Sequence, residues 1–132
     1  MAESAIGAWP AGFNTVTLFT ADLAATKQFY IDVFGLPVIF EDADSAVFRL
    51  GAMLINLLKD SAAHELIEPA RVAPAAAGSR LQFTIDVDDV DAMCAELARR
   101  GVTLLNGPMD RPWGIRTASF VDPGGHIWEI AK

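Results

Sequence analysis

The chain has 132 residues, of which 52 % are hydrophobic and 20 % are charged, so it can bury the core of one domain and is not disordered. Its 10 lysines and arginines against 17 aspartates and glutamates give a net charge of −7. This balance argues against nucleic acid and anionic membrane surfaces as partners, because both attract a basic protein face. Two histidines and one cysteine exclude an intrachain disulfide and a zinc site of four Cys or His ligands.

No targeting or membrane segment is predicted. Residues 1–10 carry no Lys or Arg and no long apolar stretch, so they do not resemble a secretory signal. The richest apolar run, residues 46–58, is interrupted by Arg49, Gly51 and Asn56 and is too short to span a bilayer. We therefore expect a cytoplasmic protein.

The first half of the chain reads as one βαβββ module. After an N-terminal extension at residues 1–12, residues 13–20 alternate and are rich in β-branched side chains, which predicts a strand. Asp22 opens a helical pattern that Gly35 ends. Three strand-like segments follow, at residues 37–41, 45–50 and 52–58. The first module therefore covers residues 13–58.

A linker separates this module from the second half. Residues 59–79 contain Pro69, Pro74 and Gly78, which predict a loop, with a helical turn near residues 64–67. The length of this loop allows it to move or to cover a site.

The pattern of the first module then returns in residues 80–132. Residues 80–87 predict a strand, Asp89 opens a helix that Gly101 ends, and strand-like segments follow at residues 102–106, 114–121 and 126–131. Asp89 lies 67 residues after Asp22, and residues 127–130 align with residues 54–57 at an offset of 73. This repetition indicates an internal duplication.

The predicted fold class is α+β, with two tandem βαβββ modules that form a curved, half-open barrel-like sheet with helices outside. A four-stranded sheet with one helix on one face must also cover its other face, and a concavity there can hold a ligand. The free edges of such a sheet favour pairing, so we expect a homodimer.

Several segments stand in an order and spacing that one known family shares. They are residues 15–18, 22–23, 29–30 and 34–36 in the first half, and residues 87–91 and 122–130 in the second. Together they resemble the vicinal oxygen chelate superfamily of glyoxalases, bleomycin-resistance proteins and dioxygenases. The resemblance covers nearly all of the chain beyond residue 12 and implies the same duplicated fold.

The resemblance also implies four metal-ligand positions, two from each half, which this chain fills with Thr15, Asn56, Gln82 and Glu129. Of these, Glu129 alone keeps the usual ligand chemistry. Neutral oxygen donors bind transition metals weakly unless anionic or imidazole partners assist them. We therefore predict no metal cofactor, with a divalent metal loosely held by Glu129 as the alternative.

Strand alternation predicts which side chains face the concavity. An unpaired polar side chain is costly in a packed core, so a polar row indicates a ligand-binding face rather than a core. The predicted row comprises Thr15, Thr17, Phe19, Asn56, Gln82, Thr84 and Glu129.

Two features of this face have alternative interpretations. Glu129 either hydrogen-bonds Gln82 and Asn56 in a wet cavity or acts as a general base or ligand anchor. Trp113 and Arg116 either offer a stacking surface and an anion donor at the cavity mouth, or are a packed rim residue and a surface ion pair. We interpret His126, after Asp122, as a turn residue and His64 as a solvated linker residue.

The sequence leaves open whether the chain is an enzyme. The first hypothesis is a non-enzymatic protein that binds a small organic, aromatic or antibiotic-like molecule without metal, as the bleomycin-resistance branch implies. The second is a glyoxalase-like lyase, isomerase or dioxygenase that uses Glu129 as its catalytic residue with a weakly held divalent metal. A third is a dimeric scaffold whose cavity is vestigial.

Overall fold

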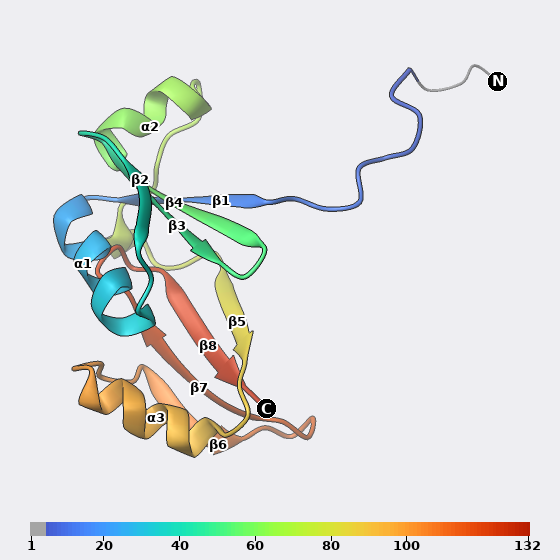
Figure 1. The fold of residues 1–132 in the computed structure, drawn as a ribbon, viewed down its shortest axis with the longest axis vertical. Helices are drawn as coiled ribbons and strands as arrows, with labels where there is room; N and C mark the ends of the chain where they lie inside the picture. Colours follow the sequence, from blue (N-terminus) through green and yellow to red (C-terminus); the bar gives the residue numbers. More distant parts are fainter. Residues whose placement is uncertain (1–4) are drawn as a thin grey trace.

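The computed structural model describes residues 5–132 (Figure 1). The predicted extension at residues 1–12 therefore falls partly outside the described residues. Residues 5–14 contain no helix or strand and extend outward from the body of the molecule. The first strand begins directly after them, at Thr15.

The first module contains one helix and one four-stranded sheet. Its elements are β1 (Thr15–Thr20), α1 (Leu23–Phe34), β2 (Val38–Glu41), β3 (Ser45–Leu50) and β4 (Met53–Lys59). The strand order is β1-β4-β3-β2, with β1 parallel to β4 and the other pairs antiparallel.

The second module repeats this arrangement. Its elements are β5 (Gln82–Asp86), α3 (Val90–Arg99), β6 (Asn106–Asp110), β7 (Arg116–Val121) and β8 (Ile127–Ala131). The strand order is β5-β8-β7-β6, and β5 is parallel to β8. The predicted α+β fold of two βαβββ modules is thus confirmed.

Both module helices begin as the sequence predicts. The Asp22 carboxylate accepts a hydrogen bond from the backbone N–H of Ala25 at 3.0 Å, and the Asp89 carboxylate accepts one from Ala92 at 3.0 Å. These bonds satisfy N–H groups that have no partner within the helix. Gly35 ends α1 in the left-handed conformation, which glycine adopts without steric cost.

Two predicted segments differ from the structure. The strand predicted at residues 102–106 is wrong except for its last residue, because β6 begins at Asn106. Val102 and Leu104 pack against the core while Thr103 and Leu105 are exposed, so the alternation arises from packing. Contact with β7 begins only with the hydrogen bond from the Leu105 N–H to the Ser119 carbonyl oxygen at 2.7 Å. In the linker, the short turn predicted at residues 64–67 is a full helix, α2 (Asp60–Ile67), and a 3-10 turn follows at Ala75–Ala77.

One aromatic core joins the two modules. The Tyr30 ring of α1 lies 5.6 Å from Phe48 of the first sheet and 6.1 Å from Trp128 of the second, measured between ring centroids. Phe34, one turn further along α1, contacts Trp128 and Phe120. Helix α1 therefore packs against the apolar faces of both sheets (Figure 1). The two sheets form no closed barrel.

Candidate functional site

The two modules carry the same kind of polar pair at the same register. In the first sheet, the Asn56 amide donates a hydrogen bond to the Thr17 hydroxyl at 3.3 Å. In the second sheet, the Thr84 hydroxyl donates to Glu129 Oε1 at 3.0 Å. Thr17 is the register partner of Asn56, as Thr84 is of Glu129. Each threonine therefore orients the amide or carboxylate on the neighbouring parallel strand.

Both pairs lie on the faces of the sheets that turn away from the aromatic core. Leu18 and Ile55, which alternate with the first pair, are almost fully buried, as are Trp128 and Ile130 beside the second. Thr15, Gln82 and Thr84 are exposed, whereas Phe19, Asn56 and Glu129 are half-buried. The predicted alternation of a polar face with an apolar face is thus present in both sheets.

The structure brings each pair together but does not bring the two pairs into one site. No hydrogen bond within residues 5–132 links Thr17 or Asn56 to Thr84 or Glu129. The two cavities beside the linker include Thr17 in one wall but neither Asn56, Thr84 nor Glu129. The apolar faces of both sheets contact α1, so the polar faces, on the opposite side of each sheet, point away from that helix.

The donors at the four family ligand positions do not fit a transition metal. Thr15, Asn56 and Gln82 are neutral oxygen donors, and Glu129 contributes the one carboxylate. Sites for such metals rely on imidazole, thiolate or several carboxylates. Over residues 5–132, no group of three or more His, Cys, Asp or Glu side chains could hold a metal ion.

The predicted rim pair of Trp113 and Arg116 is arranged differently from an anion site. Arg116 donates to Asp91 at 2.9 Å and to Asp110 at 3.0 Å, and these bonds raise the pKa of its guanidinium above the ordinary value. Arg116 thus forms the surface ion pair that was one of the two interpretations. Trp113, 68 % exposed, lies instead beside Arg111, whose guanidinium carbon is 5.9 Å from the ring centroid.

Arg111 is a residue that the sequence reasoning missed. Its Nε–H donates to the Thr117 hydroxyl at 2.8 Å, and Thr117 is fully buried. Arg111 stands two residues before Trp113 in the sequence, and this spacing could have indicated it as the partner of Trp113 in place of Arg116.

A buried hydrogen-bond network around Asp122 was also missed. Asp122 is 4 % exposed and accepts a 2.7 Å hydrogen bond from the hydroxyl of Tyr30, which in turn accepts one from Trp128 Nε1–H at 3.1 Å. Burial, and then the charge of Asp122, raises the pKa of Tyr30 well above its ordinary value. The Asp122 carboxylate also accepts from the backbone N–H of His126, which lies in a turn as predicted.

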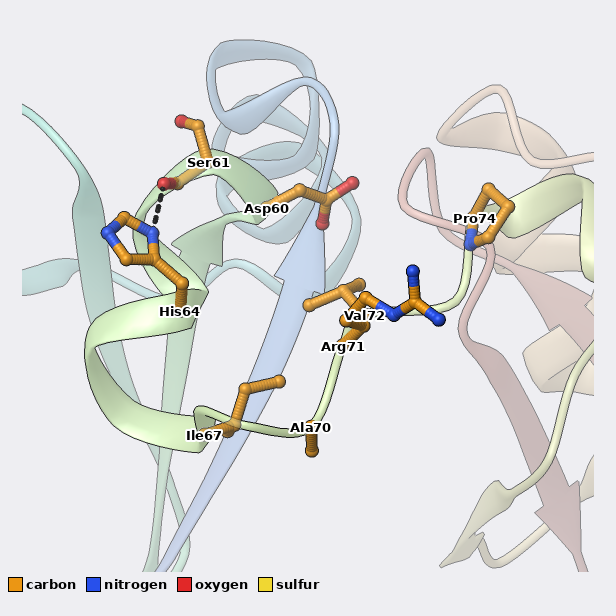
Figure 2. A pocket seen from close by; sticks show the side chains of 8 residues that line it. All are labelled: Asp60, Ser61, His64, Ile67, Ala70, Arg71, Val72 and Pro74. Atoms are coloured by element: carbon orange, nitrogen blue, oxygen red, sulfur yellow. Dashed lines mark hydrogen bonds between the residues drawn. The ribbon is translucent and has the colours of Figure 1, made fainter.

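Two cavities lie beside the linker. The first, about 370 Å³, is enclosed by α2 and the segment after it. Figure 2 shows its lining, with the His64 ring turned back toward the first turn of α2, where Nδ1 lies 2.8 Å from the Ser61 carbonyl oxygen. The second, about 270 Å³, lies between β1, residues 72–81 and the turn that contains His126. Both include Asp60, Val72 and Pro74 in their walls.

Comparison with known proteins agrees with this architecture. A profile of the Glyoxalase/Bleomycin resistance protein/Dioxygenase superfamily matches residues 12–130. The uncharacterized protein YraH of Bacillus subtilis (strain 168) is 31 % identical over 121 residues, which are 89 % of this chain and 94 % of that protein. Metallothiol transferase FosB of Lysinibacillus sphaericus (strain C3-41) is 24 % identical over 119 residues, 89 % of this chain and 79 % of that protein.

Solved structures share the fold as well. A glyoxalase/bleomycin resistance protein/dioxygenase from Nocardioides superposes with a TM-score of 0.85 at 22 % identity, over 96 % of this chain and 85 % of that chain. Within residues 5–132, no helix has the length and apolar character needed to cross a membrane.

Proposed function

Because the chain belongs to the Glyoxalase/Bleomycin resistance protein/Dioxygenase superfamily, we propose that it binds a small organic molecule, aromatic or antibiotic-like, without a metal. The observation that carries this proposal is the repeated polar pair, Thr17 with Asn56 and Thr84 with Glu129, on sheet faces that the core does not use. A pair that served packing alone would lie in the core, where polar groups need partners.

Glu129 is the ligand anchor in this proposal. Its Oε1 accepts the Thr84 hydroxyl proton at 3.0 Å, and its second oxygen forms no hydrogen bond to any of residues 5–132. A fixed carboxylate with one oxygen available accepts a hydrogen bond from a hydroxyl, amide or ammonium group of a ligand. The Asn56 amide supplies a neutral donor and acceptor at the equivalent position of the other module.

The proposed assembly is a homodimer in which the two pairs of one cavity come from two chains. Each sheet packs its apolar face on helices of its own chain, the first on α1 and the second on α1 and α3, and leaves its polar face without cover from the other sheet. In a twofold-symmetric dimer, the polar face of the first sheet of each chain faces the polar face of the second sheet of the other chain. Both polar faces are then covered at once.

Calorimetric titration with a panel of small aromatic compounds, combined with metal analysis of the purified protein, tests the binding function. We expect a compound to bind after chelator treatment and to bind at least tenfold more weakly to Glu129→Gln. The matched control is Glu41→Gln, which removes a carboxylate that pairs with Lys27 on the surface. Unchanged binding by Glu129→Gln refutes its role as anchor, and failure of every compound to bind favours a vestigial scaffold.

The alternative function is a lyase, isomerase or dioxygenase with a divalent metal at Glu129. The retained carboxylate is the observation that favours it, and the donor chemistry of Thr15, Asn56 and Gln82 opposes it. A stoichiometric metal that Glu129→Gln loses, together with turnover that chelators abolish, establishes this alternative in place of the first.

Mixed dimers test the shared cavity. Chains carrying Asn56→Ala or Glu129→Gln each disable one half of every cavity in a homodimer. If the cavity is built from two chains, a mixed dimer regains one intact cavity and binds half the native stoichiometry. A monomer in analytical ultracentrifugation, or no recovery in the mixed dimer, contradicts the assembly.

The cytoplasmic location stays a prediction, which cell fractionation checks.

A further inference from the structure

A second cavity stands apart from the Glu129 carboxylate and has a histidine in its wall. The 270 Å³ space is lined by β1, residues 72–81 and the turn at residues 123–126, and its walls include Phe19, Leu81, Pro123 and His126. Ligand sites are concave and mostly apolar, with a few placed polar groups, and those for drug-sized molecules begin near about 300 Å³. This cavity therefore suits a molecule built on a single ring.

Asp122 fixes the orientation of the His126 imidazole. The ring Nδ1 lies 2.9 Å from both Asp122 carboxylate oxygens, and the Asp122 side chain is fully buried. The same carboxylate accepts hydrogen bonds from Tyr30 and from the backbone N–H groups of Gly124 and His126. Because every other neighbour donates to this carboxylate, Nδ1 carries a hydrogen as well, and in the neutral ring Nε2 is then the acceptor.

Gly124 leaves the space in which the ring lies. A Cβ atom at this position would come within 2.6 Å of His126 Cε1 and 3.0 Å of Nδ1. The imidazole is thus held by Asp122 at one nitrogen and by the Gly124 backbone along one edge. The His126 side chain is 15 % exposed, and its Nε2 forms no hydrogen bond to any residue from 5 to 132.

The charges around the cavity indicate a neutral ligand. Asp60 and Arg80 both contribute to the lining, so a carboxylate and a guanidinium of opposite sign border the same space. We propose that this cavity binds a small neutral hydroxyl compound with one aromatic ring, and that the ring packs on Phe19 and Pro123 while the hydroxyl donates a hydrogen bond to His126 Nε2. Asp122 is the positioning residue that keeps Nε2 an acceptor.

Phenol and its methyl ether anisole test this site on the ¹⁵N-labelled full chain. The two probes have nearly the same shape, but anisole lacks the donor hydroxyl. At about pH 8 we expect phenol to shift the ¹⁵N resonance of His126 Nε2 and to bind at least tenfold more tightly than anisole. His64, whose Nδ1 lies 2.8 Å from the Ser61 carbonyl, is the internal control and stays unshifted.

The variant His126→Asn separates the proposed role from a purely structural one. The Asn amide nitrogen takes the position of Nδ1 and can still donate to Asp122, but nothing replaces Nε2. We expect phenol to bind this variant at least tenfold more weakly, with the native thermal midpoint largely kept. The matched control, His64→Asn, binds phenol as the native chain does.

Three results overturn the proposal. They are equal affinity for phenol and anisole, phenol binding that His126→Asn keeps, and an Nε2 that bears the hydrogen while Nδ1 is bare. The comparison of phenol with anisole needs no variant, so it decides the question even where His126→Asn fails to fold. The cavity shares Thr17 with the first polar pair but is not lined by Asn56 or Glu129. We therefore expect Glu129→Gln to keep phenol binding while it weakens the ligand of the proposed function, and with this variant the two proposals fail separately.

Discussion

Replacement of Tyr30 by phenylalanine tests the network that joins the two modules. The Tyr30 ring is fully buried between Phe48 and Trp128, and its hydroxyl connects α1 to Asp122 at the end of β7. Phenylalanine keeps the ring and its packing and removes only the oxygen. The change therefore measures the polar connection between the modules rather than the volume of the core.

The expected loss in the free energy of unfolding is about 3 kcal/mol. A hydrogen bond to a charged group contributes about 1.5 to 3 kcal/mol, and the Tyr30 hydroxyl makes one to Asp122 at 2.7 Å. The same change leaves Trp128 Nε1–H without its 3.1 Å acceptor, and a buried unpaired donor costs about 1 to 3 kcal/mol. Asp122 keeps its bonds from His126 and Gly124, which limits the loss to the lower part of the summed range.

Alkaline pH gives the same change a second signature. Burial and the Asp122 charge raise the pKa of Tyr30 well above its ordinary value of 10.0. Above pH 10 the unfolded chain loses this proton while the folded chain keeps it, so stability is full below pH 10 and falls as the pH rises. The slope from this group is about 1.4 kcal/mol per pH unit. Tyr30→Phe lacks it.

Urea unfolding of both chains, followed by tryptophan fluorescence between pH 7 and 11, measures both effects. Because the chain has one tyrosine, tyrosinate absorbance reports on this group alone. Ser79→Ala is the control, since it removes an exposed hydroxyl bonded to the Leu81 carbonyl and is expected to change stability by less than about 0.5 kcal/mol. A loss below about 1 kcal/mol for Tyr30→Phe, or parallel curves for the two chains above pH 10, refutes the reasoning.

Three further predictions concern the fold, and urea unfolding or thermal melting measures each. Gly107→Ala should lower the free energy of unfolding by about 3 kcal/mol or more, because its φ is +86° and the new Cβ would lie 2.5 Å from the Thr117 carbonyl oxygen. Gly51→Ala should lower it by about 1 kcal/mol, because φ is +59° there but no atom lies within 4 Å of the new Cβ. Similar costs for the two would contradict the close contact. Asp22→Ala and Asp89→Ala should each lose about 1 kcal/mol through their helix caps, and an unchanged midpoint argues against those caps. Arg116→Gln should lower the melting temperature slightly at low salt and not at 1 M NaCl, because both of its ion pairs are exposed; an equal drop at both salt concentrations would show a role beyond charge.

The fold was predictable because its signals are local. Each module helix begins at an aspartate that caps it, and the strands show an alternation that the sheets then use. The failure at residues 102–106 has a physical cause: Val102 and Leu104 alternate because they pack on the core, while backbone pairing with β7 begins only near Asn106. Side-chain periodicity reports burial, and it reports pairing only where a partner strand is present.

The candidate site was predictable within each module and not between them. Thr17 pairs with Asn56, and Thr84 pairs with Glu129, because each pair lies at the equivalent position of the two parallel strands in its module. The relative direction of the two sheets depends on α1, whose aromatic side chains contact both. Nothing in the strand pattern reveals that α1 contacts both sheets, so the sequence suggested one concavity where the chain presents two separate polar faces.

The residues that the sequence reasoning missed lie where the two modules differ. At the duplication offset of 67, Tyr30 corresponds to Leu97, which is buried in the same way but has no hydroxyl. The turn from β7 to β8 runs from Asp122 to His126, whereas the equivalent turn from β3 to β4 consists of Gly51 and Ala52. The hydrogen bond from Tyr30 to Asp122 spans 92 residues and has no counterpart in the repeat. A duplicated core needs neither of these polar groups for packing, and their place beside the His126 cavity is consistent with a role in that site.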